Sequence, residues 1–217
     1  MLDRVIKGVY PPGSTIKPFI AIAGLSHDFR VPPYQISDPG YFTMPNNSKT
    51  FRDWKRDGHG LVDVVKAIAV SCDTFFYGLG LDLGVRKMNQ TLSSYGFGKK
   101  TGIDIKGEKS GLIADEKWKK NARNERWFAG ETAITAIGQG FSQVTPIQLA
   151  HATAKIALPN NINYSSPFFL LNSKTPKQKM EDGTPTLPVK ENILDLVKKG
   201  MVGVTQPGGT AAFLSNA

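Results

Sequence analysis

The chain has 217 residues, of which 40% are hydrophobic and 21% are charged, as in an ordinary soluble globular protein. This length allows one large domain or two small ones. The formal charge of +9 suits an anionic partner. No signature of a DNA- or RNA-binding fold accompanies that charge, which argues against a nucleic-acid-binding protein.

Cysteine usage and hydropathy add further exclusions. Cys72 is the single cysteine, so an internal disulfide is impossible. No apolar run approaches the ~20 residues of a membrane span. Residues 1–7 lack the apolar core and small-residue cleavage site of a secretory signal. These features alone predict a cytoplasmic protein, an expectation that the motifs below change.

The first predicted element is a buried helix that follows a Pro-Pro-Gly turn. Ser14 falls at or just inside the helix N-terminus, and the apolar segment 20–25 continues the helix. Lys17 lies three residues after Ser14, so the two side chains are expected to share one helical face. Pro18 is compatible with the first turn, where its missing N–H would have no intrahelical partner.

A serine and a lysine so placed suit nucleophilic catalysis. The hydroxyl of Ser14 needs a base, and Lys17 can be that base if burial lowers its pKa. The helix N-terminus would favour an oxyanion formed beside Ser14. The alternative is that Ser14 only caps the helix and Lys17 is a solvated surface residue, because so short a motif is weak by itself.

The middle of the chain predicts a loop region followed by helices. Residues 31–60 are rich in proline, glycine, asparagine and aspartate, and favour a loop with a hairpin that pairs 41–44 with 51–54. Apolar spacing predicts the next helix over 61–70, with Asp63 as its cap. Further helices are expected over 74–83, 85–95 (ended by Gly96), 115–124, 145–158 and 191–202.

The second half of the chain contains a basic helix and a long polar segment. The basic residues of the helix over 115–124 and its flank are interpreted as a solvated face, interrupted by Trp118 and Trp127. Residues 97–111 form a glycine-rich turn region, and 131–140 are apolar and rich in small residues. Residues 159–190 predict a surface loop, with a strand over 167–171. The basic residues are Lys117, Lys119, Lys120, Arg123 and Arg126.

Several short motifs follow one another in a characteristic order. Ser14-x-x-Lys17 precedes Ser71-x-Asp73, and Gly138-Gln139-Gly140 follows. This order resembles the class B penicillin-binding proteins, and within them the penicillin-binding protein 2 branch. The resemblance covers nearly the whole chain, and it is specific because six or more motifs agree in order. The others include Tyr10-Pro11-Pro12-Gly13, Asp38-Pro39-Gly40, Asp53-Trp54-Lys55, Gly58-His59-Gly60, Thr101-Gly102-Ile103-Asp104, Thr145-Pro146-Ile147-Gln148 and Gly209-Thr210-Ala211.

The resemblance implies an α+β fold of the serine β-lactamase/transpeptidase type, here mostly its helical part with an incomplete sheet. It also implies a peptidoglycan D,D-transpeptidase of cell elongation and cell shape. Ser14 would attack the D-Ala–D-Ala carbonyl of a stem peptide, and Lys17 would accept its proton. Ser71 would relay protons to the leaving group beside Asp73. Penicillin would acylate Ser14, and catalysis would need no cofactor.

The sequence departs from the family pattern at two motifs. The second motif usually ends in asparagine, whereas this chain has Asp73, an anion that would oppose a neutral Lys17 unless burial outweighs it. The third motif, Lys-Thr/Ser-Gly on a strand, is missing after Thr210. Residues 100–102 spell Lys-Thr-Gly, but they lie in a turn that the family carries separately, and we interpret them as a chance match.

The same resemblance sets expectations about context. Residues 1–217 are expected to be a transpeptidase domain truncated at both ends. The implied location is periplasmic, in a protein anchored to the inner membrane by a segment outside this chain. The implied partners are peptidoglycan stem peptides, β-lactams and membrane-bound cell-elongation proteins, the last reached through regions outside this chain.

Four potential metal ligands lie between or within the first two motifs. Asp38, Asp53, His59 and Cys72 offer carboxylate, imidazole and thiolate groups, all of which bind zinc. A structural zinc could pin the loop over 31–60. The alternative is that Cys72 is a small buried hydrophobe and the acids are turn residues. If Ser71 and Asp73 face the active site, Cys72 points away from it.

Two other functions stay open at this point. A serine β-lactamase shares Ser-x-x-Lys, but it needs a water-activating group that the sequence does not identify. A catalytically silent β-lactam sensor or scaffold would tolerate the missing third motif. Slow deacylation argues against the first alternative, and turnover of a stem-peptide analogue argues against the second.

Overall fold

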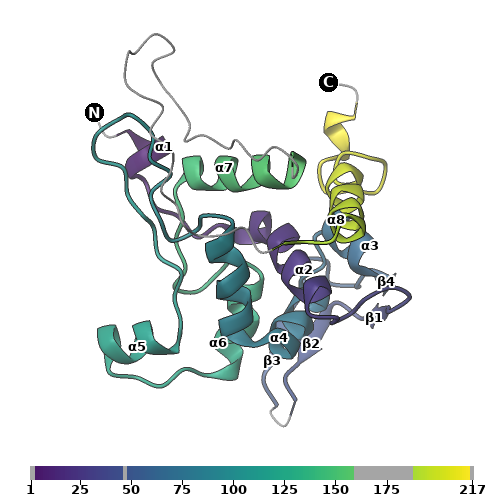
Figure 1. Cartoon of the computed structure of the whole chain (residues 1–217). Coiled ribbons are helices and arrows are strands. Elements are labelled where there is room, and N and C mark those ends of the chain that lie inside the picture. Colours follow the sequence, from purple (N-terminus) through teal and green to yellow (C-terminus); the bar gives the residue numbers. More distant parts are fainter. Residues whose placement is uncertain (1–2, 46–47, 159–187, 216–217) are drawn as a thin grey trace.

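The computed structural model describes residues 3–45, 48–158 and 188–215, and shows a mainly helical α+β fold (Figure 1). Two small antiparallel sheets lie at one side of the helices. None of the helices in these described ranges combines the length and the apolar character that crossing a bilayer requires. The predicted strand over 167–171 lies outside the described residues.

Helix α2 (Lys17–Ser26) lies at the centre of the core, and all of its residues except Ser26 are buried. It packs on α4 (Asp73–Ser94), which also packs on α6 (Ala129–Ala136). Phe19 of α2 meets Tyr95 and Phe97 edge-on, with ring centroids 5.2 and 4.9 Å apart. The predicted buried helix therefore lies inside the core, where α3 (Val64–Ala69), α4 and α8 (Glu191–Gly203) pack on it.

The predicted hairpin is present, and a second strand pair flanks it. Strand β2 (Tyr41–Thr43) pairs with β3 (Thr50–Arg52), as expected. Strand β1 (Ile36–Asp38) pairs with β4 (Gly60–Val62), which the sequence did not indicate. The register of this second pair places Asp38 opposite Gly60 and so brings two parts of the loop region together.

Helix starts agree with the predicted caps, with one shift. Helix α3 (Val64–Ala69) begins after Asp63, whose carboxylate accepts the Lys66 N–H. The prediction that this helix begins at residue 61 is wrong, because Leu61 belongs to β4. Two further predicted caps are present, Asp115 for α5 (Glu116–Arg123) and Thr145 for α7 (Pro146–Ala157).

The two helices expected over 74–83 and 85–95 form one element with a break. Gly84 has φ 74° and ψ 156°, so the backbone of α4 leaves the helical conformation between the two halves. Glycine tolerates this region far better than other residues. Helix α6 was not predicted; it begins where the Glu131 carboxylate accepts the Phe128 N–H.

The remaining helices complete the packing around this centre. Helix α3 packs on α8 (Glu191–Gly203), which also touches α2 and α7. Three short elements lie before α2 or after α8 in the chain: α1 (Arg4–Lys7), the 3-10 turn η1 (Gly13–Ile16) and the 3-10 turn η2 (Ala212–Leu214).

Candidate active site

Ser14 lies in an exposed turn just before the central helix. The turn is the 3-10 segment η1, so Ser14 lies at a helical N-terminus as predicted, although the first turn is not α-helical. The Gly13 N–H donates to the Gly138 carbonyl at 2.9 Å, and the Thr15 hydroxyl donates to the Pro12 carbonyl at 2.6 Å. The first bond ties the serine turn to the Gly-Gln-Gly segment that follows α6, and the second lies within the turn.

Lys17 is buried at 1% exposure and has a complete set of acceptors. Its ammonium nitrogen lies 2.9 Å from the Ser71 carbonyl, 3.0 Å from the Ser71 hydroxyl and 2.6 Å from an Asp73 carboxylate oxygen. The Ser71 hydroxyl in turn donates to the Ser14 hydroxyl at 2.9 Å. Ser14 and Lys17 are thus linked through Ser71.

Ser71 reaches both groups because of its backbone conformation. Its φ of 54° lies in the left-handed region, which is uncommon for a residue with a side chain. The Ser71 carbonyl and the Asp73 carboxylate both bind the Lys17 ammonium. Cys72, between them, is fully buried and its thiol bonds Asp38, so it points away from Lys17 as predicted.

The environment of Lys17 favours the neutral amine more than water does. Burial lowers the pKa of Lys17 below its usual value, and the neighbouring Asp73 carboxylate opposes this shift without cancelling it. The ring of Phe76, 5.4 Å from the nitrogen, supplies part of the apolar surroundings. A lysine with a lowered pKa can accept a proton more readily near neutral pH, as a general base must.

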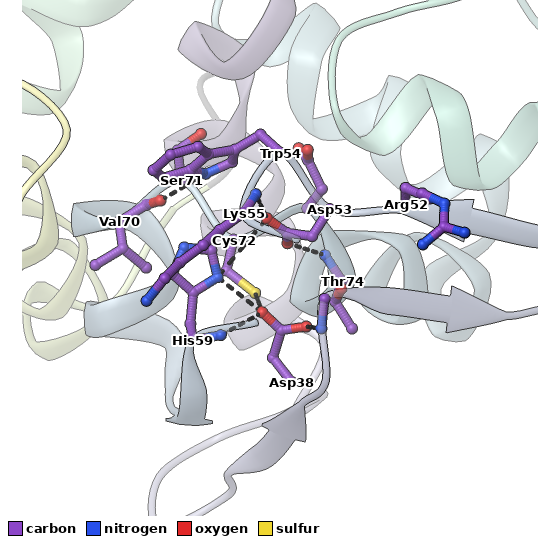
Figure 2. A network of polar contacts seen from close by, with 12 residues as sticks. Asp38, Arg52, Asp53, Trp54, Lys55, His59, Val70, Ser71, Cys72 and Thr74 are labelled. Atoms are coloured by element: carbon purple, nitrogen blue, oxygen red, sulfur yellow. Dashed lines mark hydrogen bonds and ion pairs between the residues drawn. The ribbon is translucent and has the colours of Figure 1, made fainter. Parts of the chain in front are cut away.

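The four predicted metal ligands lie in one cluster (Figure 2). One ligand atom from each of Asp38, Asp53, His59 and Cys72 lies within 4.8 Å of the others. The Asp38 carboxylate is 2.7 Å from His59 Nδ1 and 3.4 Å from Cys72 Sγ. His59 Nδ1 lies 3.7 Å from Asp53. The cluster depends on the β1–β4 pairing, because that register brings Asp38 beside His59.

The cluster is also secured to the active-site segment. Asp53 accepts the Thr74 N–H at 3.0 Å, one residue beyond Asp73. His59 Nε2 is buried and has no hydrogen-bond partner among the described residues. Burial and the nearby carboxylates raise the pKa of the Cys72 thiol, so without a cation the thiol stays protonated. The carboxylates, the imidazole and the thiol are ligand types that zinc binds, and a zinc ion here would bind the thiolate and neutralise the acids.

Trp54 is a site feature that sequence reasoning did not single out as functional. Its indole N–H donates to the Val70 carbonyl at 3.0 Å, and its side chain stays 57% exposed next to Ser71 (Figure 2). It lines a cavity of about 300 Å³ together with Lys55, His59, Lys66, Val70 and Gly208. The signal in the sequence that could have indicated this role was a tryptophan in a loop region rich in proline, glycine, asparagine and aspartate.

The Lys-Thr-Gly triplet over 100–102 has a structural role. Thr101 is buried, and its N–H and hydroxyl both donate to the Glu108 carboxylate at 2.6 Å. The Gly102 N–H donates to the other oxygen of the same carboxylate. These bonds close the glycine-rich turn, which agrees with the interpretation of this triplet as a chance match.

An exposed serine connected to a buried lysine through a second serine defines the class of active-site serine proteins whose general base is a lysine. The penicillin-binding protein transpeptidase domain family matches residues 1–216, and the chain belongs to this family. The resemblance drawn from the motifs is thereby confirmed, and so is the expected α+β fold.

The curated relatives include peptidoglycan D,D-transpeptidases named MrdA. The Acinetobacter baumannii protein is 42% identical over 212 residues, which is 96% of this chain and 31% of the relative. The Escherichia coli K12 protein is 34% identical over 216 residues, 97% of this chain and 34% of the relative. This chain therefore spans about a third of the length of these relatives.

Solved structures confirm the penicillin-binding protein 2 branch. Pseudomonas aeruginosa penicillin-binding protein 2, in complex with WCK 5153, has a TM-score of 0.89 and 38% identity, over 100% of this chain and 49% of that one. The Helicobacter pylori protein, in complex with MreC, has a TM-score of 0.85 and 33% identity, over 100% of this chain and 39% of that one.

Proposed function

We propose that this chain carries the acyl-transfer centre of a peptidoglycan D,D-transpeptidase that serves cell elongation and cell shape. The observation that carries the proposal is the hydrogen-bonded series from Asp73 through Lys17 and Ser71 to Ser14. Relatives described as peptidoglycan D,D-transpeptidases support the substrate class.

In the proposed reaction, Ser14 Oγ attacks the carbonyl of the D-Ala–D-Ala bond. Its proton moves by way of the Ser71 hydroxyl to neutral Lys17, and the same groups return a proton to the departing D-alanine amine. An amino group of a second peptidoglycan strand then attacks the acyl-enzyme, releases Ser14 and forms the cross-link. Asp73 holds the Lys17 ammonium while the proton resides there.

The same serine accounts for β-lactam binding in this proposal. The strained amide of a penicillin would acylate Ser14 and leave a slowly hydrolysed ester. We further propose a periplasmic site of action in an inner-membrane-anchored protein, with cell-shape proteins as partners. The wall-synthesis names of the relatives and the MreC complex of the Helicobacter pylori protein support this placement.

Intact-mass detection of a penicillin adduct tests the nucleophile. We expect one adduct on the parent protein in its full natural length, none on Ser14→Ala, and an unchanged adduct on the control Ser26→Ala, which removes an exposed hydroxyl at the other end of α2. An adduct that persists on Ser14→Ala would refute the assignment. Cross-linking of a stem-peptide analogue separates the enzyme from a silent sensor, and slow loss of the adduct separates it from a β-lactamase.

We also propose that Asp38, Asp53, His59 and Cys72 hold a structural zinc ion. The convergence of four ligand atoms, all of types that zinc binds, supports this assignment. The ion would pin the loop over 31–60 and take no part in acyl transfer. Its chemistry there would be to hold the thiolate and the two acids together.

Metal analysis of purified protein tests the zinc proposal. We expect about one zinc per parent chain, loss of zinc in Cys72→Ser, and retention in Asp57→Asn, which removes an exposed acid of the same loop. Equal metal content in the parent and Cys72→Ser would contradict the proposal.

A further inference from the structure

The basic face of α5 and its flank is exposed, as the sequence predicted, except at one buried lysine. Its buried lysine, Lys119, lies 2.5 Å from the Glu131 carboxylate and 3.3 Å from the Glu125 carboxylate. The first acid of the helix, Glu116, is paired with Arg86 at 2.6 Å. These pairs leave four exposed cations of the segment without a carboxylate partner among the described residues: Lys117, Lys120, Arg123 and Arg126.

The two arginines are held against aromatic rings. The guanidinium of Arg123 lies 4.7 Å from the centroid of the Phe141 ring, and that of Arg126 lies 4.7 Å from the Phe128 ring. A guanidinium over a ring face keeps its in-plane N–H groups directed outward, and that planar fork matches a carboxylate. Phe128 is itself 46% exposed, so the ring and the cation share the surface.

A short stretch of chain connects this surface to the candidate active site. Phe141 follows the Gly-Gln-Gly segment, and Gly138 accepts the hydrogen bond of Gly13 beside Ser14. Three peptide links separate Gly138 from Phe141, which is at most about 11 Å of chain. An extended stem peptide of about five residues spans roughly 17 Å. The stem peptide is thus longer than the stretch of chain between Gly138 and Phe141, the ring that Arg123 contacts.

We infer that Arg123 and Arg126, together with Lys120, form a docking surface for the carboxylates of a peptidoglycan strand whose stem peptide reaches Ser14. The inference rests on the proposed transpeptidase function and extends it to a part of the substrate remote from the reacting bond. Charge complementarity supports the occupant, because stem peptides carry free carboxylates. The connection to Gly138 favours a wall strand over an anionic membrane surface.

Binding of the full-length protein to purified peptidoglycan sacculi tests the inference. The test variant is Arg123→Gln with Arg126→Gln, and the control is Lys198→Gln with Lys199→Gln on α8, which removes the same charge on the opposite side of the molecule (Figure 1). We expect the test variant to bind sacculi about fivefold to tenfold more weakly than the control, since two exposed charge pairs are lost. Sacculi with amidated carboxyls should bind both variants equally.

Two parallel measurements separate the outcomes. Penicillin acylation of Ser14 should be the same in parent, test and control proteins; its absence from the parent would refute the proposed function itself. With acylation intact, equal sacculus binding by test and control variants, or no binding by the parent, would overturn the docking surface. If the test variant lost binding to phosphatidylglycerol vesicles but not to sacculi, the docking surface would also be overturned, and the cations would be assigned to membrane binding.

Discussion

Replacing Asp73 with asparagine tests whether this acid sets the protonation of Lys17. The two charges are 2.6 Å apart. Coulomb's law gives about 1.6 kcal/mol for that distance at the dielectric constant of water and about 6.4 kcal/mol at an effective value of 20. Losing an attraction of at least this size weakens proton binding by about tenfold or more, so the pKa of Lys17 should fall further in Asp73→Asn.

The sign of the effect follows from the charge of the acid. The Asp73 anion stabilises the Lys17 ammonium, so its removal lets Lys17 lose a proton at lower pH. The acid limb of the pH–rate profile for acylation should move to lower pH by at least about one unit. The assay is the second-order rate constant for a fluorescent penicillin, measured across pH on the parent and the variant.

Asp82→Asn is the matched control for this prediction. Asp82 lies on the same helix, and its carboxylate pairs with Arg30 at 2.7 Å rather than with Lys17. The control should leave the acid limb in place. An unmoved acid limb in Asp73→Asn, or a shift to higher pH, would show that Lys17 is not the group whose deprotonation limits acylation.

Three further substitutions probe the site and its support. Ser71→Ala removes the hydroxyl between Ser14 and Lys17, and single-turnover acylation should slow by about 10² to 10⁴; a normal rate would exclude the proton route through Ser71. Gly138→Ala places a methyl group against the Gly13 carbonyl at a positive φ of 73°, so acylation and thermal stability should both fall, and retention of both would contradict the tight approach. Thr145→Ala removes the cap of α7 and should cost about 1 kcal/mol in denaturant unfolding, with acylation retained in the folded protein; no measurable loss would mean that the cap is dispensable.

Helix starts were predictable because their signals are local. Asp63, Asp115 and Thr145 each cap a helix through a bond to an N–H three residues away, and such a bond can be anticipated from neighbouring residue types. Helix α6 was missed because residues 129–136 are mostly small and give little apolar contrast between faces.

Long-range pairing was the part that the sequence could not supply. Strands β1 and β4 have only three residues each, too few for an alternating pattern to predict them. They are also far apart in the chain, so no turn sequence indicates their register. The metal-ligand set could be named from residue types, but its geometry needs Asp38 opposite Gly60.

The hydrogen bonds of Lys17 show the same limit. Spacing predicted that Lys17 and Ser14 share a face, whereas the lysine binds the carbonyl and hydroxyl of a residue 54 positions later. That contact depends on the left-handed backbone at Ser71, and no residue type in the sequence signals a positive φ there.

The segment Ser71-Cys72-Asp73 contributes residues both to the candidate active site around Lys17 and to the buried cluster of Asp38, Asp53 and His59. Its first and third residues hold the lysine, and its second residue joins the buried cluster of acids and imidazole. Because the three residues are consecutive, displacement of the Cys72 thiol by oxidation or by a foreign metal must also move the Ser71 carbonyl and the Asp73 carboxylate that bind Lys17. Chemical damage to Cys72 should therefore register first as slower acylation of Ser14, before any loss of helical structure.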